Sequence, residues 1–131
     1  MAKKEEVMVV LQDLLKMDDV LACMLAKQGL GGVVPDAMKV KDVNLWNLVK
    51  STTNDIFPII SKFFLYKIDR LYFELGDYTI IFAPISNVFS LLVIIPSLAN
   101  MGLIDVEVEN SKRKIKEILD KKEDAATGST V

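Results

Sequence analysis

Few side chains in this sequence are equipped for covalent chemistry, and the most common general base is missing. The 131 residues include no histidine and one cysteine. A serine or cysteine nucleophile would therefore lack its usual imidazole partner. Cys23 lies within an apolar run, where a buried and inert thiol is the expected state, and a lone cysteine excludes an internal disulfide.

Two short motifs raise the question of a metal or phosphate site, and both have simpler explanations. The pair Asp18-Asp19 falls between a predicted helix and a predicted strand, where turn chemistry accounts for it. The glycine-rich stretch "GLGG" (29–32) is not followed by lysine and serine or threonine and opens no helix, so it indicates a hairpin turn. We therefore expect no catalytic residue, no metal, no cofactor, and a protein that is not an enzyme.

The elements that must position any site include an uncharged segment, "YTIIFAPISNVFSLLVIIPSLANMGLI" (78–104). A re-entrant membrane hairpin is the alternative interpretation of such a segment. Prolines and asparagines divide it into short pieces rich in branched and aromatic residues, which is typical of strands and unfavourable in hydrocarbon. We expect two antiparallel strands buried on both faces, and no membrane insertion.

Length and charge restrict the class of protein further. The chain is long enough for one domain with its own core, expected over residues 1–122 and followed by a disordered tail at 123–131. Hydrophobic residues make up 51%, which suggests that a second subunit covers part of the apolar surface. The net charge of −2 argues against nucleic acid as a partner. Because no secretory signal is evident, a cytoplasmic location is expected.

Apolar spacing predicts the first half of the fold. Apolar residues from Val7 to Leu15 recur at helical spacing, and a mostly apolar strand follows at Val20–Ala26. A turn at Gln28-Gly29 leads to a short second strand expected at a sheet edge. Asp42 is placed to cap a long helix over Val43–Leu65, which has two apolar rows and therefore two burial partners.

The second half is predicted to form three strands and a helix. Lys67–Leu75 alternates with charge, as an edge strand does, and Val88–Ile95 is almost wholly apolar, as a central strand is. The last helix is capped by Ser97 or Asn100. The predicted fold is an α/β (α+β) sandwich with a five-stranded, mainly antiparallel sheet of order 2-1-5-4-3. One long helix covers one face, and the two terminal helices cover the other.

This order of elements, together with three phrases, resembles the roadblock/dynein light chain family. The phrases are "VLQDLLKMDDVLACML", "KQGL" and "ANMGLIDVEVENSKRKIKEIL", and the resemblance spans about residues 7–119. Two features depart from the family pattern: the glycine-rich second strand "LGGVV" and Pro58 within the long helix. The resemblance implies a non-enzymatic platform for small Ras-like GTPases. An adaptor or scaffold that ignores the nucleotide state is the alternative.

The resemblance also implies a homodimer joined by its long helices and by its third strands, edge to edge. The residues expected in that interface are Ile56, Ile60, Phe63, Ile68, Arg70, Tyr72 and Glu74. The residues expected to bind a partner are Trp46, Asn47, Lys50, Asn54 and Asp55, with Trp46 as anchor or, alternatively, as a packing residue against the dimer mate. Arg70 and Arg113 are the only candidates for an arginine finger; we favour structural roles, a cross-strand ion pair for Arg70 and a solvated helix face for Arg113.

Overall fold

The computed structural model describes residues 2–36, 38–39 and 41–121. The predicted tail, 123–131, lies outside the described residues. The elements in chain order are α1 (Lys3–Leu15), β1 (Ala22–Lys27), β2 (Leu30–Val33), α2 (Val43–Phe63), the 3-10 helix η1 (Phe64–Tyr66), β3 (Leu71–Leu75), β4 (Tyr78–Pro84), β5 (Phe89–Pro96) and α3 (Met101–Asp120).

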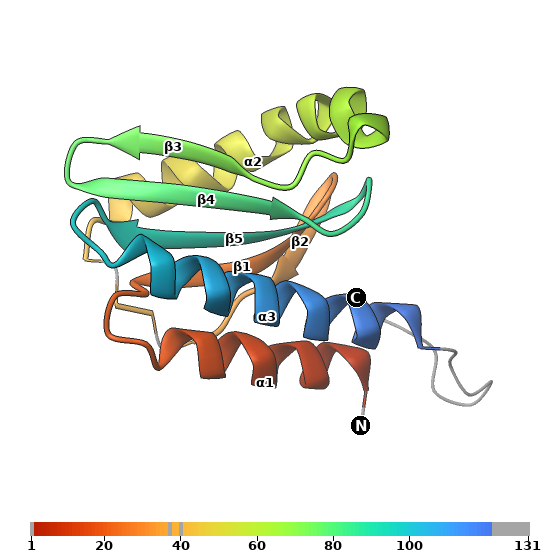
Figure 1. Ribbon diagram of the computed structural model, residues 1–131, viewed down its shortest axis with the longest axis horizontal. Helices are drawn as coiled ribbons and strands as arrows, with labels where there is room; N and C mark the ends of the chain where they lie inside the picture. Colours follow the sequence, from red (N-terminus) through yellow and green to blue (C-terminus); the bar gives the residue numbers. More distant parts are fainter. Residues whose placement is uncertain (1, 37, 40, 122–131) are drawn as a thin grey trace.

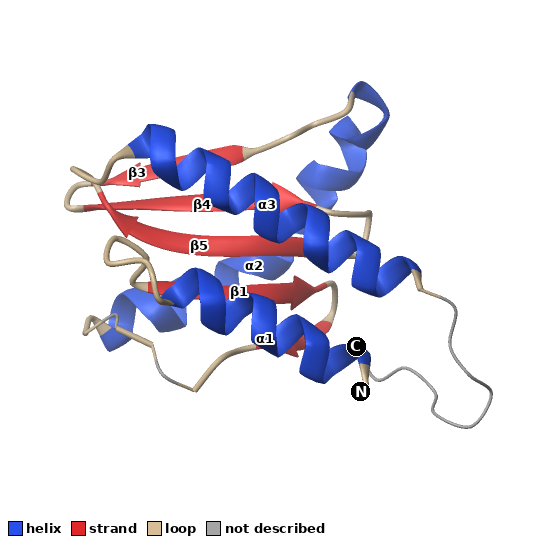
Figure 2. Ribbon diagram, turned by 60° about the horizontal axis from the view of Figure 1, so that its bottom comes forward, coloured by secondary structure: helices blue, strands red, loops and turns tan. Residues whose placement is uncertain are grey.

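The sheet has five strands in the order β2-β1-β5-β4-β3, and every neighbouring pair is antiparallel. Helices α1 and α3 lie side by side on one face, and α2 crosses the other face (Figures 1 and 2). The predicted fold class and strand order are therefore confirmed. None of the helices within the described residues has the length and apolar character needed to cross a membrane.

The central position of β5 divides the core into two layers. Because successive side chains of a strand point to opposite faces, Leu91, Val93 and Ile95 pack toward α1 and α3. Leu92 and Ile94 pack toward α2. All five side chains are fully buried, which explains why β5 carries no charged residue.

Side-chain caps fix where the two long helices begin. The Asp42 carboxylate accepts a hydrogen bond of 3.0 Å from the Leu45 amide at the start of α2. The Asn100 side chain accepts one of 3.2 Å from the Leu103 amide, so Asn100 and not Ser97 caps α3. Each cap satisfies a backbone donor that has no partner within the first turn of its helix.

The chain between α2 and β3 differs from the prediction. The expected helix to Leu65 ends at Phe63 and continues as η1, and the strand expected from Lys67 begins only at Leu71. Lys67 adopts a left-handed conformation with φ of 61°. A lysine rarely does so, and nothing in its sequence context signals it. This residue turns the chain from the axis of α2 into the sheet.

Candidate protein-interaction surfaces

The predicted partner-binding residues lie on the first four turns of α2. Helical geometry places Trp46, Asn47, Lys50 and Asn54 within an arc of about 100°, with Asp55 further round the helix. Trp46 is half-buried against the core layer beneath α2, and the other four side chains are exposed. The Lys50 ammonium lies 5.6 Å from the centre of the Trp46 ring, close enough for a cation–π contact.

One side of this row borders a groove that sequence reasoning did not anticipate. Lys50 and Asn54 face the glycines of the β1–β2 hairpin across a groove of about 270 Å³. The glycines lack side chains that would fill it. The α2 surface therefore combines a ring, an ammonium group, amides and exposed backbone, a mixture that suits a reversible protein contact.

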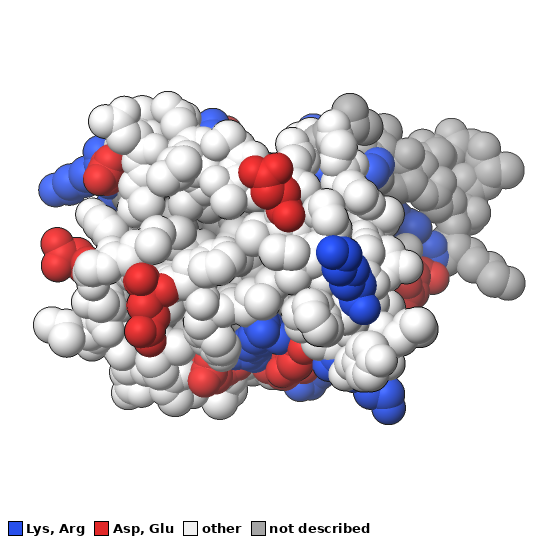
Figure 3. Space-filling view, turned by 90° about the horizontal axis from the view of Figure 1, so that it is seen from above, with Lys and Arg blue, Asp and Glu red and all other residues white. Residues whose placement is uncertain are grey.

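The other side of α2, which faces the edge strand β3, is apolar and uncovered by any described element. Leu48, Ile59 and Phe63 are 58%, 40% and 51% exposed. Figure 3 shows the molecule from this side, with a largely uncharged surface crossed by a few charged side chains. We call this surface the α2–β3 face; its exposed apolar residues are Leu48, Ile59 and Phe63 on α2 and Leu75 on β3.

An apolar groove of about 250 Å³ opens on the α2–β3 face. It lies between the first half of α2 and the end of β3, and no charged residue lines it. The lining residues are Leu48, Val49, Thr52, Phe73, Leu75, Ile80 and Phe82. Exposed contiguous apolar surface of this kind is typical of a site that another protein covers.

The residues predicted for a dimer interface fall into different environments. Ile56 and Ile60 are 5% and 1% exposed, because they pack onto the sheet within the same chain, so they offer a second copy almost no surface. Phe63, Tyr72 and Glu74 are exposed, and Ile68 is half-buried. Three exposed apolar residues on or beside β3 were not predicted: Leu48, Ile59 and Leu75.

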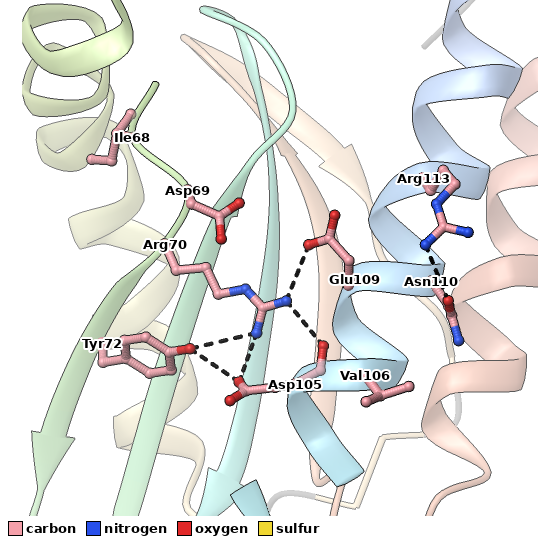
Figure 4. A pocket seen from close by; sticks show the side chains of 9 residues that line it. All are labelled: Ile68, Asp69, Arg70, Tyr72, Asp105, Val106, Glu109, Asn110 and Arg113. Atoms are coloured by element: carbon pink, nitrogen blue, oxygen red, sulfur yellow. Dashed lines mark hydrogen bonds and ion pairs between the residues drawn. The ribbon is translucent and has the colours of Figure 1, made fainter. Parts of the chain in front are cut away.

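Arg70 does not form the cross-strand ion pair that the sequence suggested. It reaches from the residue before β3 to α3, where its guanidinium contacts the Asp105 carboxylate at 2.6 Å and the Glu109 carboxylate at 3.2 Å (Figure 4). It also donates to the Asp105 carbonyl oxygen at 3.0 Å and to the Tyr72 hydroxyl at 3.4 Å. Its side chain is only 9% exposed.

These contacts place Arg70 in one wall of an open cleft of about 900 Å³ between β3 and α3 (Figure 4). Burial disfavours the charged guanidinium, but its hydrogen bonds to Tyr72 and Glu109 outweigh burial, and the pKa of Arg70 is raised. Next to it, a hydrogen bond from Lys112, 3.0 Å away, lowers the pKa of Asp69. Arg70 is thus a link between strand and helix rather than a free cation. Arg113 lies on an exposed part of α3, as expected.

The side chains that could take part in chemistry lie in structural environments. Cys23 is fully buried on β1 and donates to the Leu11 carbonyl oxygen at 3.3 Å. Burial raises the pKa of the Cys23 thiol to about 12, so it is protonated and unreactive at neutral pH. Within the described part of the chain, no three side chains of histidine, cysteine, aspartate or glutamate converge as a metal site would require.

Comparison with solved structures identifies the fold. The chain has the fold of roadblock/LC7 domains: it matches such a domain from Streptomyces avermitilis with a TM-score of 0.68 and 11% identity, covering 87% of this chain and 98% of that one. It is also similar to MglB from Myxococcus xanthus, with a TM-score of 0.73, 14% identity, and coverage of 92% of this chain and 95% of MglB. A third similar structure is the gliding protein MglB from Thermus thermophilus, with a TM-score of 0.69 and 14% identity, covering 90% of this chain and 91% of that one.

At these identities the likeness establishes the fold, in agreement with the resemblance in sequence. The sequence itself matches no family model and no curated protein.

Proposed function

We propose that this protein is a non-enzymatic, dimeric platform that binds and regulates a small Ras-like GTPase. The observation that carries the proposal is the uncovered, apolar α2–β3 face on a roadblock fold. A single chain leaves Leu48, Ile59 and Phe63 in water beside an apolar groove. The roadblock resemblance gives this face a use, since such domains pair through the long helix and the third strand.

The edge of β3 supports pairing with a second copy. In the β3–β4 hairpin, Leu75 is paired with Tyr78 next to a two-residue turn, so Leu75, Phe73 and Leu71 exchange backbone hydrogen bonds with β4. The amides and carbonyls of Tyr72 and Glu74 therefore point toward the free edge. An antiparallel partner strand about a two-fold axis would satisfy them. Assembly is also a property of a similar structure, an MglB in a tetrameric arrangement.

The proposed GTPase surface is the row Trp46, Asn47, Lys50, Asn54 and Asp55, present twice in the dimer. Trp46 is the anchor because it is partly exposed, rigidly backed by the core and capped by the Lys50 ammonium. A monomeric GTPase binds a two-fold surface either off the axis or as one copy per dimer. In this proposal the platform supplies no catalytic side chain, since the guanidinium of Arg70 is engaged by α3.

The second candidate is a scaffold that binds its partner in the same way whatever nucleotide the partner holds. The same surface serves both functions, so the discriminating quantity is the ratio of affinities for the GTP-bound and GDP-bound partner. A ratio well above one supports a regulator, and a ratio of one supports a scaffold.

The test is a titration of the purified protein against the small Ras-like GTPases of the same organism, each in its GTP-bound and GDP-bound state. We expect Trp46→Ala to weaken binding about 30-fold, the equivalent of about 2 kcal/mol for a hot-spot residue. Leu103→Ala is the matched control, because Leu103 is an exposed apolar residue on the opposite face. Equal affinities of wild type and Trp46→Ala would contradict the assigned surface. Absence of binding to any such GTPase would contradict the function.

A further inference from the structure

The most exposed pair of large apolar residues next to the α2–β3 face is in η1. Leu65 and Tyr66 are 92% and 82% exposed, whereas Phe64 of the same turn is half-buried against the core layer beneath α2. We call η1, Phe64–Tyr66, the corner. In Figures 1 and 2 it projects beyond the sheet at the end of α2.

The backbone holds the corner in a defined shape rather than leaving it as an open loop. The Lys67 amide donates to the Phe64 carbonyl oxygen at 2.9 Å, and Lys67 itself takes a left-handed conformation with φ of 61°. Phe64 anchors the turn to the core. Leu65 and Tyr66 are therefore presented outward by a fixed scaffold, which lowers the conformational cost of inserting them into a second surface.

The apolar groove lies at the opposite end of the same face. Its lining residues Leu48 and Leu75 come from the first half of α2 and from the last residue of β3, whereas the corner follows the end of α2. Fifteen helical residues separate Leu48 from Phe63, which corresponds to about 22 Å along the axis of α2. The groove and the corner of one chain therefore cannot meet.

A two-fold axis through the middle of β3 brings them together between chains. Antiparallel pairing of two β3 strands exchanges the two ends of the face, so the corner of each copy meets the groove of the other. The contact occurs twice, as an isologous interface requires. Both partners are apolar and uncovered, and neither needs a residue from outside this sequence.

Charge at the two ends of the face is complementary. Lys62 and Lys67 flank the corner, and Glu74 and Asp77 flank the end of β3 beside the groove. None of these four side chains forms an ion pair within the part of the chain that the structure describes. Exchange of ends places the lysines of one copy near the carboxylates of the other, which favours this arrangement over a parallel one.

We propose that Leu65 and Tyr66 of each copy insert into the apolar groove of a second copy and thereby fix the relative position of the two α2 helices. This inference rests on the proposed dimer and adds to it a specific contact. Because the partner-binding row lies on α2, the corner sets the spacing of the two Trp46 side chains that a GTPase would meet.

The test uses engineered disulfides in the full chain. A variant with Leu65→Cys and Leu75→Cys cannot form the bond within one chain, because Leu65 lies in η1, before β3 begins, whereas Leu75 is the last residue of β3, and a disulfide needs Cα atoms within about 7 Å. We expect mild oxidation to convert most of it to a covalent dimer on a non-reducing gel. The native Cys23 does not interfere, since it is fully buried.

The matched control combines Leu65→Cys with Val9→Cys, because Val9 is 47% exposed, close to the 45% of Leu75, and lies on α1, on the opposite face of the sheet from the groove. Cross-linking by random collision would be equal in both double variants. A second variant, Tyr66→Glu, is expected to weaken the dimer at least tenfold without changing the far-UV circular dichroism spectrum, and Val9→Glu is expected to leave the dimer unchanged.

Light scattering on the wild type separates the possible failures. A dimeric wild type whose 65/75 variant cross-links no more than the 65/9 control would overturn the corner contact and leave the dimer standing. A monomeric wild type at micromolar concentration would overturn both. Preferential cross-linking of the 65/75 variant, together with a weakened Tyr66→Glu dimer, supports the contact.

Discussion

Arg70 shows how a single charged residue can hold an edge strand in place. β3 pairs with β4 on one side only, and neither terminal helix lies over it as they lie over β5. The guanidinium ties the start of this strand to two carboxylates one turn apart on α3. The sequence indicated a structural role for Arg70 but placed its partner on a neighbouring strand, because spacing along a chain carries no information about which helix lies opposite.

We expect Arg70→Met to lower the free energy of unfolding by about 1–2 kcal/mol. Charged hydrogen bonds of buried donors are worth about 1.5–3 kcal/mol, and the half-exposed carboxylates reduce that figure through solvent screening. Urea denaturation, at fixed protein concentration and in buffer without added salt, measures this loss of unfolding free energy.

Arg113→Met is the control, since Arg113 is exposed and makes one long contact, 3.4 Å, to Asn110. Its expected effect is within about 0.5 kcal/mol. Equal losses for the two variants would show that the cluster around Arg70 contributes nothing specific.

At the scale of elements, β2 lies so close to β1 that one of its two glycines has no room for a side chain. A Cβ at Gly32 would collide with the Leu25 carbonyl oxygen, whereas a Cβ at Gly31 meets nothing within 4 Å. The register shifts between Leu25 and Lys27, which marks a bulge at this point. The sequence predicted a short, glycine-weakened edge strand, and this is confirmed; which glycine is indispensable depended on the register.

Gly32→Ala is therefore expected to destabilise the protein by about 1–3 kcal/mol, the range for a methyl group forced into packed structure. Gly31→Ala, one residue away in the same strand, is the matched control. It is expected to be neutral or to stabilise by up to about 1 kcal/mol by restricting the unfolded chain. Thermal unfolding measures the stability of both variants. A Gly31→Ala variant less stable than Gly32→Ala would contradict the described register.

Other elements were predictable to different degrees. Alternation and helical spacing identified all three long helices, all five strands and their order, because burial imposes those periods on the sequence. The start of β3 was misplaced because the left-handed Lys67 leaves no compositional trace. The sequence predicted two apolar rows on α2 but not which residues face outward: Phe57 is fully buried in the core, while Leu48 and Ile59 are exposed.

At the scale of the whole molecule, apolar surface is distributed unevenly between two faces. On α1 and α3, the exposed residues Val9, Leu103 and Val106 border no apolar groove comparable to that on the other face. The α2–β3 face gathers Leu48, Ile59, Phe63 and Leu75 beside an unpaired strand edge and an apolar groove, and this difference is the reason for proposing a dimer. The sequence anticipated the excess of apolar residues but not which side of α2 would carry it.

Phe63→Glu is expected to convert the dimer to a monomer at about 10 μM, because it places two charges in an apolar interface without partners. Leu103→Glu is a closely matched control: Leu103 is 52% exposed and Phe63 51%, but Leu103 lies on α3. Multi-angle light scattering reports the masses. A monomeric Leu103→Glu, or a dimeric Phe63→Glu, would assign the interface to the other face.

The contacts between α1 and α3 have a practical consequence for attaching this chain to other molecules. The Lys3 ammonium donates to the Leu119 carbonyl oxygen at 3.1 Å, and Lys121 pairs with Glu6 at 2.8 Å, so the start of α1 and the end of α3 adjoin. Both lie on the side of the sheet away from α2 (Figure 1). A fusion partner, affinity tag or surface tether joined before α1 or after α3 would thus leave from the same end of the domain. Either attachment would keep the tether on the opposite side of the sheet from α2, so an immobilised protein would present Trp46 to the solution in the same orientation.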